Sequence, residues 1–410
     1  MKSAQNIWII TKYASSREYG FESRLFALAR KFVSMGRSMT IISSDSNHLA
    51  KYPTFRKLYN REKVDGADVH WIRTLRYQRT ASLRRILSWL DFEIKLFLMP
   101  KKDIENPDVI IVSSLSLLTI LNGIWLKRKY KCKLIFEIRD IWPLTLVAEG
   151  GFDKHNPFVL LLGWIERKGY EKSDLIVGTM PNLTSHVTKV TGKALPCCCV
   201  PFGFEPSFFE QPGALPDGFS KRYIPSGKFV VGYAGSVGLT NALETLIESA
   251  KRLSNDDRFF FMILGDGDMR EKFISDTSGM ANIVFIPKVE RDQVQAILQL
   301  CDLLYFAVYD SEVWEYGLSL NKLIDYMMAS KPVVASYSGY QSMLNEAGSG
   351  LFIPSADVEA LIDTLYKFVD LPREEMIAMG ASGREWLINN RNWDALAQEY
   401  LKHCDSLIEQ

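Results

Sequence analysis

The chain alternates short apolar runs of strand length with amphipathic stretches of helical period, and this alternation occurs in two successive series. In the first half, the run Trp8–Thr11 precedes a stretch over residues 21–34 in which apolar side chains recur every three or four positions. Alternation at this spacing is typical of βαβ units and predicts a parallel sheet. The other strand-like runs of the first half are Met39–Ser43, Val109–Val112, Leu134–Ile138 and Leu175–Gly178.

The second series begins after Glu210–Ser226, a proline- and glycine-containing segment that we interpret as an interdomain connection. Because 410 residues are long for a single domain, we predict an α/β chain with two doubly wound domains, 1–206 and 207–390, and a helical tail over 391–410. The strand-like runs of this series are Phe229–Tyr233, Phe259–Leu264, Ile283–Ile286, Leu303–Ala307, Val333–Ser336 and Leu351–Ile353.

The net charge of +1 conceals an asymmetry between the two halves. Residues 1–206 contain 32 Lys and Arg against 19 Asp and Glu, a net charge of +13, whereas residues 207–410 contain 17 against 29, a net charge of −12. A basic half favours an anionic partner such as lipid headgroups, nucleic acid or a phosphorylated substrate. The six cysteines show no zinc-ligand spacing, so we expect reduced thiols and no metal site.

The segment 316–336 combines a glycine-containing loop, a short amphipathic helix and a buried strand. A loop that leads into a helix N-terminus presents free main-chain N–H groups at the positive end of the helix dipole, which suits a diphosphate. The amides of Ser319, Leu320 and Asn321 are therefore predicted to hold such a group. Asp325, one turn into the helix, is placed to accept hydrogen bonds from a ribose.

Two other strand ends carry residues suited to a site. The run 229–234 leads into Gly235-Ser236, a turn in which the main chain can approach a ligand closely. The run Leu134–Ile138 leads into Arg139-Asp140-Ile141-Trp142-Pro143. Charged side chains at the carboxyl end of a parallel strand are expected to point into a cleft, and the proline ends the strand.

These segments resemble the family 4 retaining glycosyltransferases, and the Arg-Asp-x-Trp-Pro pattern resembles the branch that builds acetamido sugars into bacterial O-antigens and capsules. The resemblance implies the GT-B fold, in which two Rossmann-like domains face each other across a cleft and the C-terminal helix crosses back to the first domain. It implies transfer of an N-acetylated deoxy sugar from a UDP-sugar to a polyprenyl-diphosphate-linked glycan, with retention of configuration and without a cofactor or metal.

The resemblance also implies roles for single residues. Asp140 and Arg139 are expected to be catalytic, with Arg24 and Trp142 elsewhere in the cleft on the acceptor side. The remaining residues are expected to bind the donor: Gly20, Gly235 and Ser236 at the diphosphate, Lys288 and Val289 at the base, Ser319, Leu320 and Asn321 at the phosphate charge, and Asp325 at the ribose.

The chain departs from the family pattern at several positions, three of which concern the candidate site. Gly317 stands where the family has the first of two paired carboxylates, and Glu312 or Glu315 could replace that group only if the loop has a different shape. No cation follows the Gly235-Ser236 turn, so the phosphate charge must be met by main-chain amides or by a cation from another segment. Arg139 stands where many members have histidine.

The stretch Arg73–Lys102 places basic residues, among them Arg79, between leucines and aromatic residues. This composition is typical of an interfacial membrane helix, whereas a core helix with solvated basic edges is the alternative. We expect a cytoplasmic protein bound peripherally to the inner membrane through its basic N-terminal domain, and no nucleic-acid partner. Two other functions stay open: a GT-B-fold UDP-sugar epimerase and a catalytically inactive, donor-binding membrane scaffold.

Overall fold

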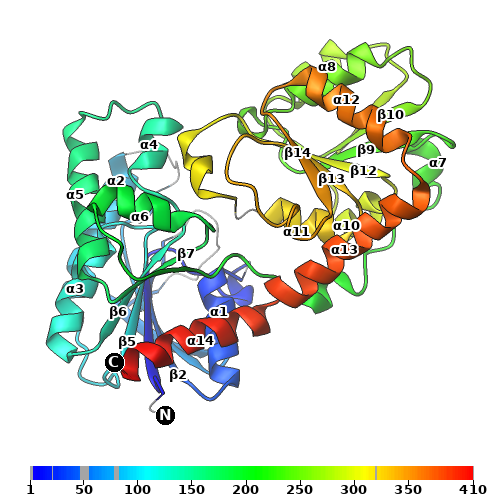
Figure 1. Cartoon of the computed structure of the whole chain (residues 1–410). Coiled ribbons are helices and arrows are strands. Elements are labelled where there is room, and N and C mark those ends of the chain that lie inside the picture. Colours follow the sequence, from blue (N-terminus) through cyan, green and yellow to red (C-terminus); the bar gives the residue numbers. More distant parts are fainter. Residues whose placement is uncertain (1–2, 21, 47–54, 78–82, 319–320, 410) are drawn as a thin grey trace. The chain divides into compact units, whose positions relative to one another are not determined.

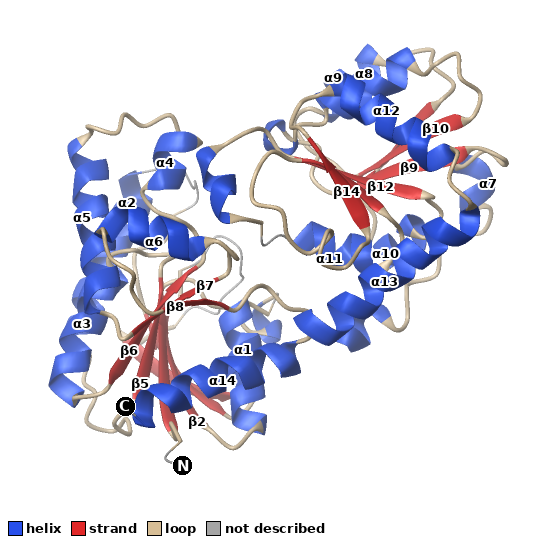
Figure 2. Ribbon diagram, viewed as in Figure 1, coloured by secondary structure: helices blue, strands red, loops and turns tan. Residues whose placement is uncertain are grey.

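The computed structural model describes residues 3–20, 22–46, 55–77, 83–318 and 321–409, which form two compact units. The first comprises Met1–Gly203 and Trp393–Gln410, and the second comprises Phe204–Asn392. Each unit is a twisted, mainly parallel sheet flanked by helices (Figures 1 and 2). The predicted fold class, two Rossmann-like α/β domains, is confirmed. The segment Glu210–Ser226, interpreted above as the connection, lies inside the second unit.

The sheet of the first unit has the order β3-β4-β2-β1-β5-β6-β7-β8, and only β3 runs antiparallel to its neighbour. Sequence analysis missed the β3–β4 hairpin, although its turn residues Asp65 and Gly66, both with positive φ, form a recognised hairpin dipeptide. The strands are β1 (Asn6–Thr11), β2 (Ser38–Ser44), β3 (Tyr59–Val64), β4 (Ala67–Ile72), β5 (Val109–Ser113), β6 (Lys133–Ile138), β7 (Leu175–Gly178) and β8 (Cys197–Cys199).

The C-terminal helix α14 (Trp393–Glu409) belongs to the first unit, where it lies along α1 (Figure 1). Its apolar face, which includes Trp393 and Tyr400, is part of the same buried cluster as α1, and Asp405 pairs with Arg37 at 2.8 Å. The helices of this unit are α1 (Arg24–Ser34), α2 (Leu83–Leu98), α3 (Thr119–Tyr130), α4 (Leu144–Ala148), α5 (Pro157–Lys172), α6 (Leu183–Thr191) and α14, with a 3-10 turn η1 (Arg17–Tyr19).

The sheet of the second unit is parallel throughout, in the order β11-β10-β9-β12-β13-β14. Its strands are β9 (Phe229–Ala234), β10 (Phe259–Leu264), β11 (Ile283–Ile286), β12 (Leu303–Ala307), β13 (Val333–Ser336) and β14 (Gly350–Ile353). Its helices are α7 (Phe219–Tyr223), α8 (Glu244–Arg252), α9 (Arg270–Asp276), α10 (Gln293–Leu298), α11 (Asn321–Met328), α12 (Val358–Val369) and α13 (Arg373–Arg391), with 3-10 turns η2 (Pro206–Phe209), η3 (Leu239–Asn241) and η4 (Glu312–Tyr316).

Both sheets reverse their strand order next to the first strand of the unit, at β1/β5 and at β9/β12. In open α/β sheets, ligands bind beyond the carboxyl ends of the strands at such a switch point. The turn after β9 is therefore the expected position for a ligand site in the second unit.

Candidate functional site

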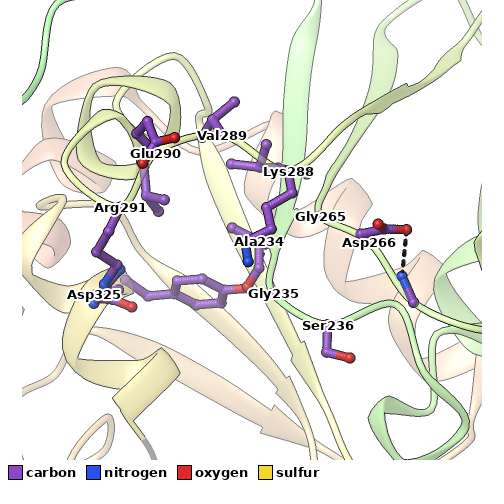
Figure 3. Close-up of a pocket in the computed structure, with 14 residues that line it drawn as sticks. Ala234, Gly235, Ser236, Gly265, Asp266, Lys288, Val289, Glu290, Arg291 and Asp325 are labelled. Atoms are coloured by element: carbon purple, nitrogen blue, oxygen red, sulfur yellow. Dashed lines mark hydrogen bonds and ion pairs between the residues drawn. The ribbon is translucent and has the colours of Figure 1, made fainter. Parts of the chain in front are cut away.

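A cavity of about 930 Å³ lies at the carboxyl ends of β9 and β10 in the second unit (Figure 3). Five residues predicted from the sequence to bind the donor line it together: Gly235 and Ser236 after β9, Lys288 and Val289 after β11, and Asp325 on α11. Its volume is within the usual range of small-molecule sites, about 300–1,000 Å³. The structure thus gathers residues that are up to ninety positions apart in the sequence.

The floor of the cavity is main chain, because the turns after β9 and β10 pack directly on each other. Gly235 donates its N–H to the Leu264 carbonyl at 3.0 Å, and Val237 donates to the Asp266 carbonyl at 2.9 Å. A Cβ on Gly265 would collide with the Gly235 carbonyl oxygen. Glycine at position 265 therefore lets the two cavity-lining turns touch.

Helix α11 is anchored to the end of β9 by Tyr326, which is fully buried. The Ala234 N–H donates to the Tyr326 hydroxyl at 2.9 Å, and that hydroxyl donates to the Ala234 carbonyl at 3.1 Å. These two bonds satisfy main-chain groups that the sheet leaves unpaired at the carboxyl end of β9, beyond its pairing with β12. They also fix the neighbouring Asp325 at the cavity wall.

Asp325 pairs with Arg291, a residue that sequence analysis did not single out. The two side chains point toward each other (Figure 3), with Nη2 of Arg291 at 2.5 Å from Oδ1 of Asp325. Burial raises the pKa of Asp325, and the Arg291 guanidinium acts in the opposite direction. Oδ2 accepts no hydrogen bond from a described residue, so one carboxylate oxygen stays available to a ligand hydroxyl.

The other predicted donor residues do not line this cavity. Ser319 and Leu320 lie outside the described residues, and Asn321 is the exposed first residue of α11. Gly20 lies in the first unit, where it caps η1 with φ 111°. Their roles toward a diphosphate stay predictions.

Gly317, at the position of the missing carboxylate, follows η4 with φ 104°. This backbone conformation favours glycine, so a glutamate at this position would be strained. Glu312 and Glu315 lie on η4 and neither lines the cavity. The altered loop therefore explains the glycine, and the structure brings no substitute carboxylate from η4 to the cavity.

In the first unit, Arg139, Asp140 and Trp142 lie together after β6. Asp140 is exposed as a residue, but desolvation of its carboxyl by the surrounding protein raises its pKa, while Arg139, the Trp142 side chain and Arg85 oppose the shift. The Arg139 guanidinium stacks on Phe202 at 5.1 Å. Burial lowers the pKa of Arg139 to about 10, so it stays cationic at neutral pH.

The expectation that Arg24 faces the cleft requires correction. Its side chain is fully buried, 3.4 Å from Glu137 of β6, and it donates to the main-chain carbonyls of Val200, at 2.6 Å, and Pro201. It also lies over the Trp393 ring at 5.9 Å. Arg24 therefore joins α1, β6, the segment after β8 and the first residue of α14, and its donors are directed at the protein rather than at a substrate.

Other sequence-based expectations concern metals and membranes. Within the described ranges, no group of three or more His, Cys, Asp or Glu side chains is arranged to hold a metal ion. None of the helices described is both long and apolar enough to span a bilayer. None of the six cysteines, all of which lie within the described ranges, forms a disulfide.

Residues 228–371, which contain the whole cavity lining, match the family model described as Glycosyl transferases group 1. A protein named as a colanic acid biosynthesis glycosyl transferase, WcaI of Escherichia coli strain K12, is 26% identical over 161 residues. That alignment spans 38% of this chain and 39% of WcaI.

Solved structures match over nearly the whole chain. Sucrose-phosphate synthase from Thermosynechococcus elongatus has a TM-score of 0.72 at 15% identity and covers 99% of both chains. An E. coli trehalose-6-phosphate protein solved with UDP-2-fluoro glucose has a TM-score of 0.73 at 11% identity, covering 98% of this chain and 99% of that one. HepE from Anabaena, solved with UDP and glucose, has a TM-score of 0.63 at 13% identity, covering 98% and 100%. The match to the family model lies within the second unit, whereas the solved structures share the fold of this chain over nearly its whole length.

Proposed function

We propose that this protein is a retaining glycosyltransferase of family 4 that moves an N-acetylated deoxy sugar from a UDP-sugar to a polyprenyl-diphosphate-linked glycan. The observation that carries the proposal is the cavity after β9, where a main-chain turn and the Asp325 carboxylate face one space. Such a cavity suits a nucleoside diphosphate, because glycine turns accept phosphates and a carboxylate accepts ribose hydroxyls.

Two comparisons favour the finer parts of this proposal. HepE and the E. coli trehalose-6-phosphate protein were solved with UDP or a UDP-sugar analogue, which favours UDP as the nucleotide. WcaI is named for colanic acid biosynthesis, which favours a bacterial polysaccharide as the product.

The proposed reaction is a displacement on one face of the sugar. The bond from the anomeric carbon to the diphosphate breaks, the acceptor oxygen forms a new bond on the same face, and the acceptor proton passes to the leaving diphosphate. The protein then contributes orientation and charge stabilisation rather than a covalent intermediate. Asp140 and Arg139 face the transferred sugar and the acceptor, and no resident metal or cofactor takes part.

Replacing Asp325 with alanine tests the donor site. We expect Asp325→Ala to weaken UDP binding about 10- to 100-fold, because a charge-assisted hydrogen bond to the ribose is lost. Folding should change little, since the partner Arg291 is 53% exposed and can be solvated. Isothermal titration with UDP measures the effect, and Asp363→Ala, on the exposed face of α12, is the matched control. Unchanged UDP affinity in Asp325→Ala would remove this residue from the donor site.

We also propose that the first unit binds peripherally to the cytoplasmic face of an anionic membrane through α2 and α3. Helix α2 buries only Ser88, Trp89, Phe92 and Leu96, and its apolar side lines a groove of about 420 Å³ together with Leu121 and Trp125 of α3. The exposed large apolar side chains of α2 are Leu83, Leu87, Leu90, Ile94, Phe97 and Leu98.

Basic residues border this apolar groove. Arg84 and Lys102 are exposed near the two ends of α2, and the exposed Lys129 lies over the Trp125 ring at 4.9 Å. Apolar side chains flanked by cations fit the interface of an anionic bilayer. One basic residue of the stretch behaves differently: Lys101 is buried and donates to the carbonyls of Leu96 and Met99 at the end of α2. Arg79 lies outside the described residues.

Vesicle flotation tests the membrane proposal. Wild type should float with phosphatidylglycerol-containing vesicles and not with phosphatidylcholine alone. Changing Ile94 and Leu98, 59% and 65% exposed, to asparagine together should abolish flotation without lowering the melting temperature. Ile377→Asn on α13, 60% exposed, is the matched control and should leave flotation intact. Wild type that does not bind either vesicle would overturn the proposal.

A further inference from the structure

Lys322, the second residue of α11, brings a cation to the turn after β9. The sequence has no basic residue directly after Gly235 and Ser236, but α11 places this lysine against the turn. A Cβ on Gly235 would lie 2.8 Å from Cε of Lys322 and 3.2 Å from its Nζ. The glycine therefore leaves room for the ammonium group beside the main chain.

Neutral groups from three elements hold the Lys322 ammonium in place. Nζ donates to the Tyr233 hydroxyl of β9 and to Oδ1 of Asn241 in η3, both at 2.8 Å. It lies over the rings of Tyr233 at 4.5 Å and Phe306 of β12 at 5.8 Å. The Tyr233 hydroxyl in turn donates to the Ser236 carbonyl at 2.6 Å, which links the lysine to the turn itself.

The charge of Lys322 has no counter-ion among the described residues. Among the residues that the structure describes, no carboxylate lies within ion-pair distance of its Nζ; Asp268, whose Oδ1 lies beside Gly238, forms no pair with it. Tyr233, the titratable group in contact with it, stays neutral because burial raises its pKa. Burial lowers the pKa of Lys322 to about 8. A desolvated cation without a counter-ion is costly, and an anionic ligand would remove that cost.

We infer that Lys322 is the cation that holds the donor diphosphate against the Gly235–Ser236 turn, an inference that rests on the proposed function. An ammonium has three N–H donors, and two are used by Tyr233 and Asn241, so one remains for a phosphate oxygen. The same contact would stabilise the charge that develops on the diphosphate when the glycosidic bond breaks. A cation from α11 thus replaces the one that the sequence lacks after β9.

Comparing UDP with uridine isolates this contact, because the two ligands differ only in the diphosphate. We expect Lys322→Gln to weaken UDP binding about 10- to 100-fold and uridine binding less than about twofold. Lys322→Arg, which keeps the charge, should recover part of the UDP affinity. Lys272→Gln, an exposed lysine on α9, should bind both ligands as wild type does.

The outcomes separate this inference from the proposed function. If wild type binds UDP and Lys322→Gln binds it equally well, the inference fails and the proposed donor site stands. If wild type binds neither ligand, both fail.

If Lys322→Gln does not fold, the pH dependence of UDP and uridine binding by wild type tests the inference instead. Because its pKa is lowered, Lys322 loses its proton as the pH rises through about 8. The diphosphate loses its last proton at about pH 6, so its charge stays constant above pH 7. The ratio of UDP to uridine affinity should therefore fall between about pH 7 and 9.5. A constant ratio over that interval would overturn the inference.

Discussion

Both sheets reverse their strand order beside the first strand of the unit, but the two units differ in the residues directly after that strand. After β1, the fully buried Lys12 extends over the rings of Tyr13, Tyr77 and Phe92, at 5.4 to 6.0 Å. After β9, Gly235 has no side chain to cover the main chain, and a cavity lies beside it.

The comparison shows that the same topological position can be filled by side chains or left open for a ligand. Burial lowers the pKa of Lys12 to about 7, with the Glu93 carboxylate opposing the shift. A cavity lined by main chain suits a group such as a diphosphate, which does not change from one nucleotide-sugar to another. The side chains at the switch point of the first unit can differ between proteins, and they therefore suit an acceptor that differs as well. We therefore assign the nucleotide to the second unit and the acceptor to the first, as part of the proposed function.

The largest expected effect is on the stability of the first unit. Arg24→Met should reduce the free energy of unfolding by about 3–5 kcal/mol, because it leaves Glu137 charged and buried without its partner. Chemical denaturation followed by circular dichroism measures this change. Arg30→Met on the same helix removes a partly exposed ion pair with Glu22 and should cost about 1 kcal/mol or less. If both variants lost the same small amount of free energy of unfolding, Arg24 would again be a candidate for a substrate-facing residue.

The next largest effect distinguishes catalysis from donor binding. Asp140→Asn should lower kcat about 10²- to 10³-fold while UDP affinity stays within about twofold, because the carboxylate acts on charge that develops during transfer. In wild type, the raised pKa of Asp140 should bring the acid limb of the kcat profile to higher pH than an ordinary aspartate gives. Equal losses of kcat and UDP affinity would indicate a binding role, and wild type that binds UDP without any transfer would favour the inactive scaffold.

The smallest effect concerns the anchor of α11. Tyr326→Phe should reduce the stability of the second unit by about 1–3 kcal/mol, because the Ala234 N–H and carbonyl lose their buried partner. UDP affinity should fall with it, since Asp325 and Lys322 lose their fixed position. Tyr309→Phe removes a hydroxyl that contacts Glu244 on the exposed surface and should change neither quantity. Unchanged UDP binding in Tyr326→Phe would show that α11 is positioned without this anchor.

The sequence by itself determined the strands of both sheets except β3, β4 and β8, and it pointed to several residues that line the cavity. The strands β7, β10, β11, β12 and β13 have the predicted bounds, because apolar runs of strand length reflect local burial on both faces of a parallel sheet. Sequence analysis also singled out five residues that line one cavity, since glycine turns and charges at strand ends have local signatures: Gly235, Ser236, Lys288, Val289 and Asp325.

Only the tertiary structure decided which groups meet. Arg24 contacts a carbonyl 176 positions away, and Lys322 contacts Asn241 across 81 positions. Arg291, an unremarkable residue in the sequence, reaches Asp325 34 positions away. Periodicity records which side of an element is buried but not which side chain lies opposite, because that depends on how separate elements pack. The sequence therefore predicted a ligand turn after β9, and the tertiary structure places Lys322 beside that turn and Arg291 beside Asp325.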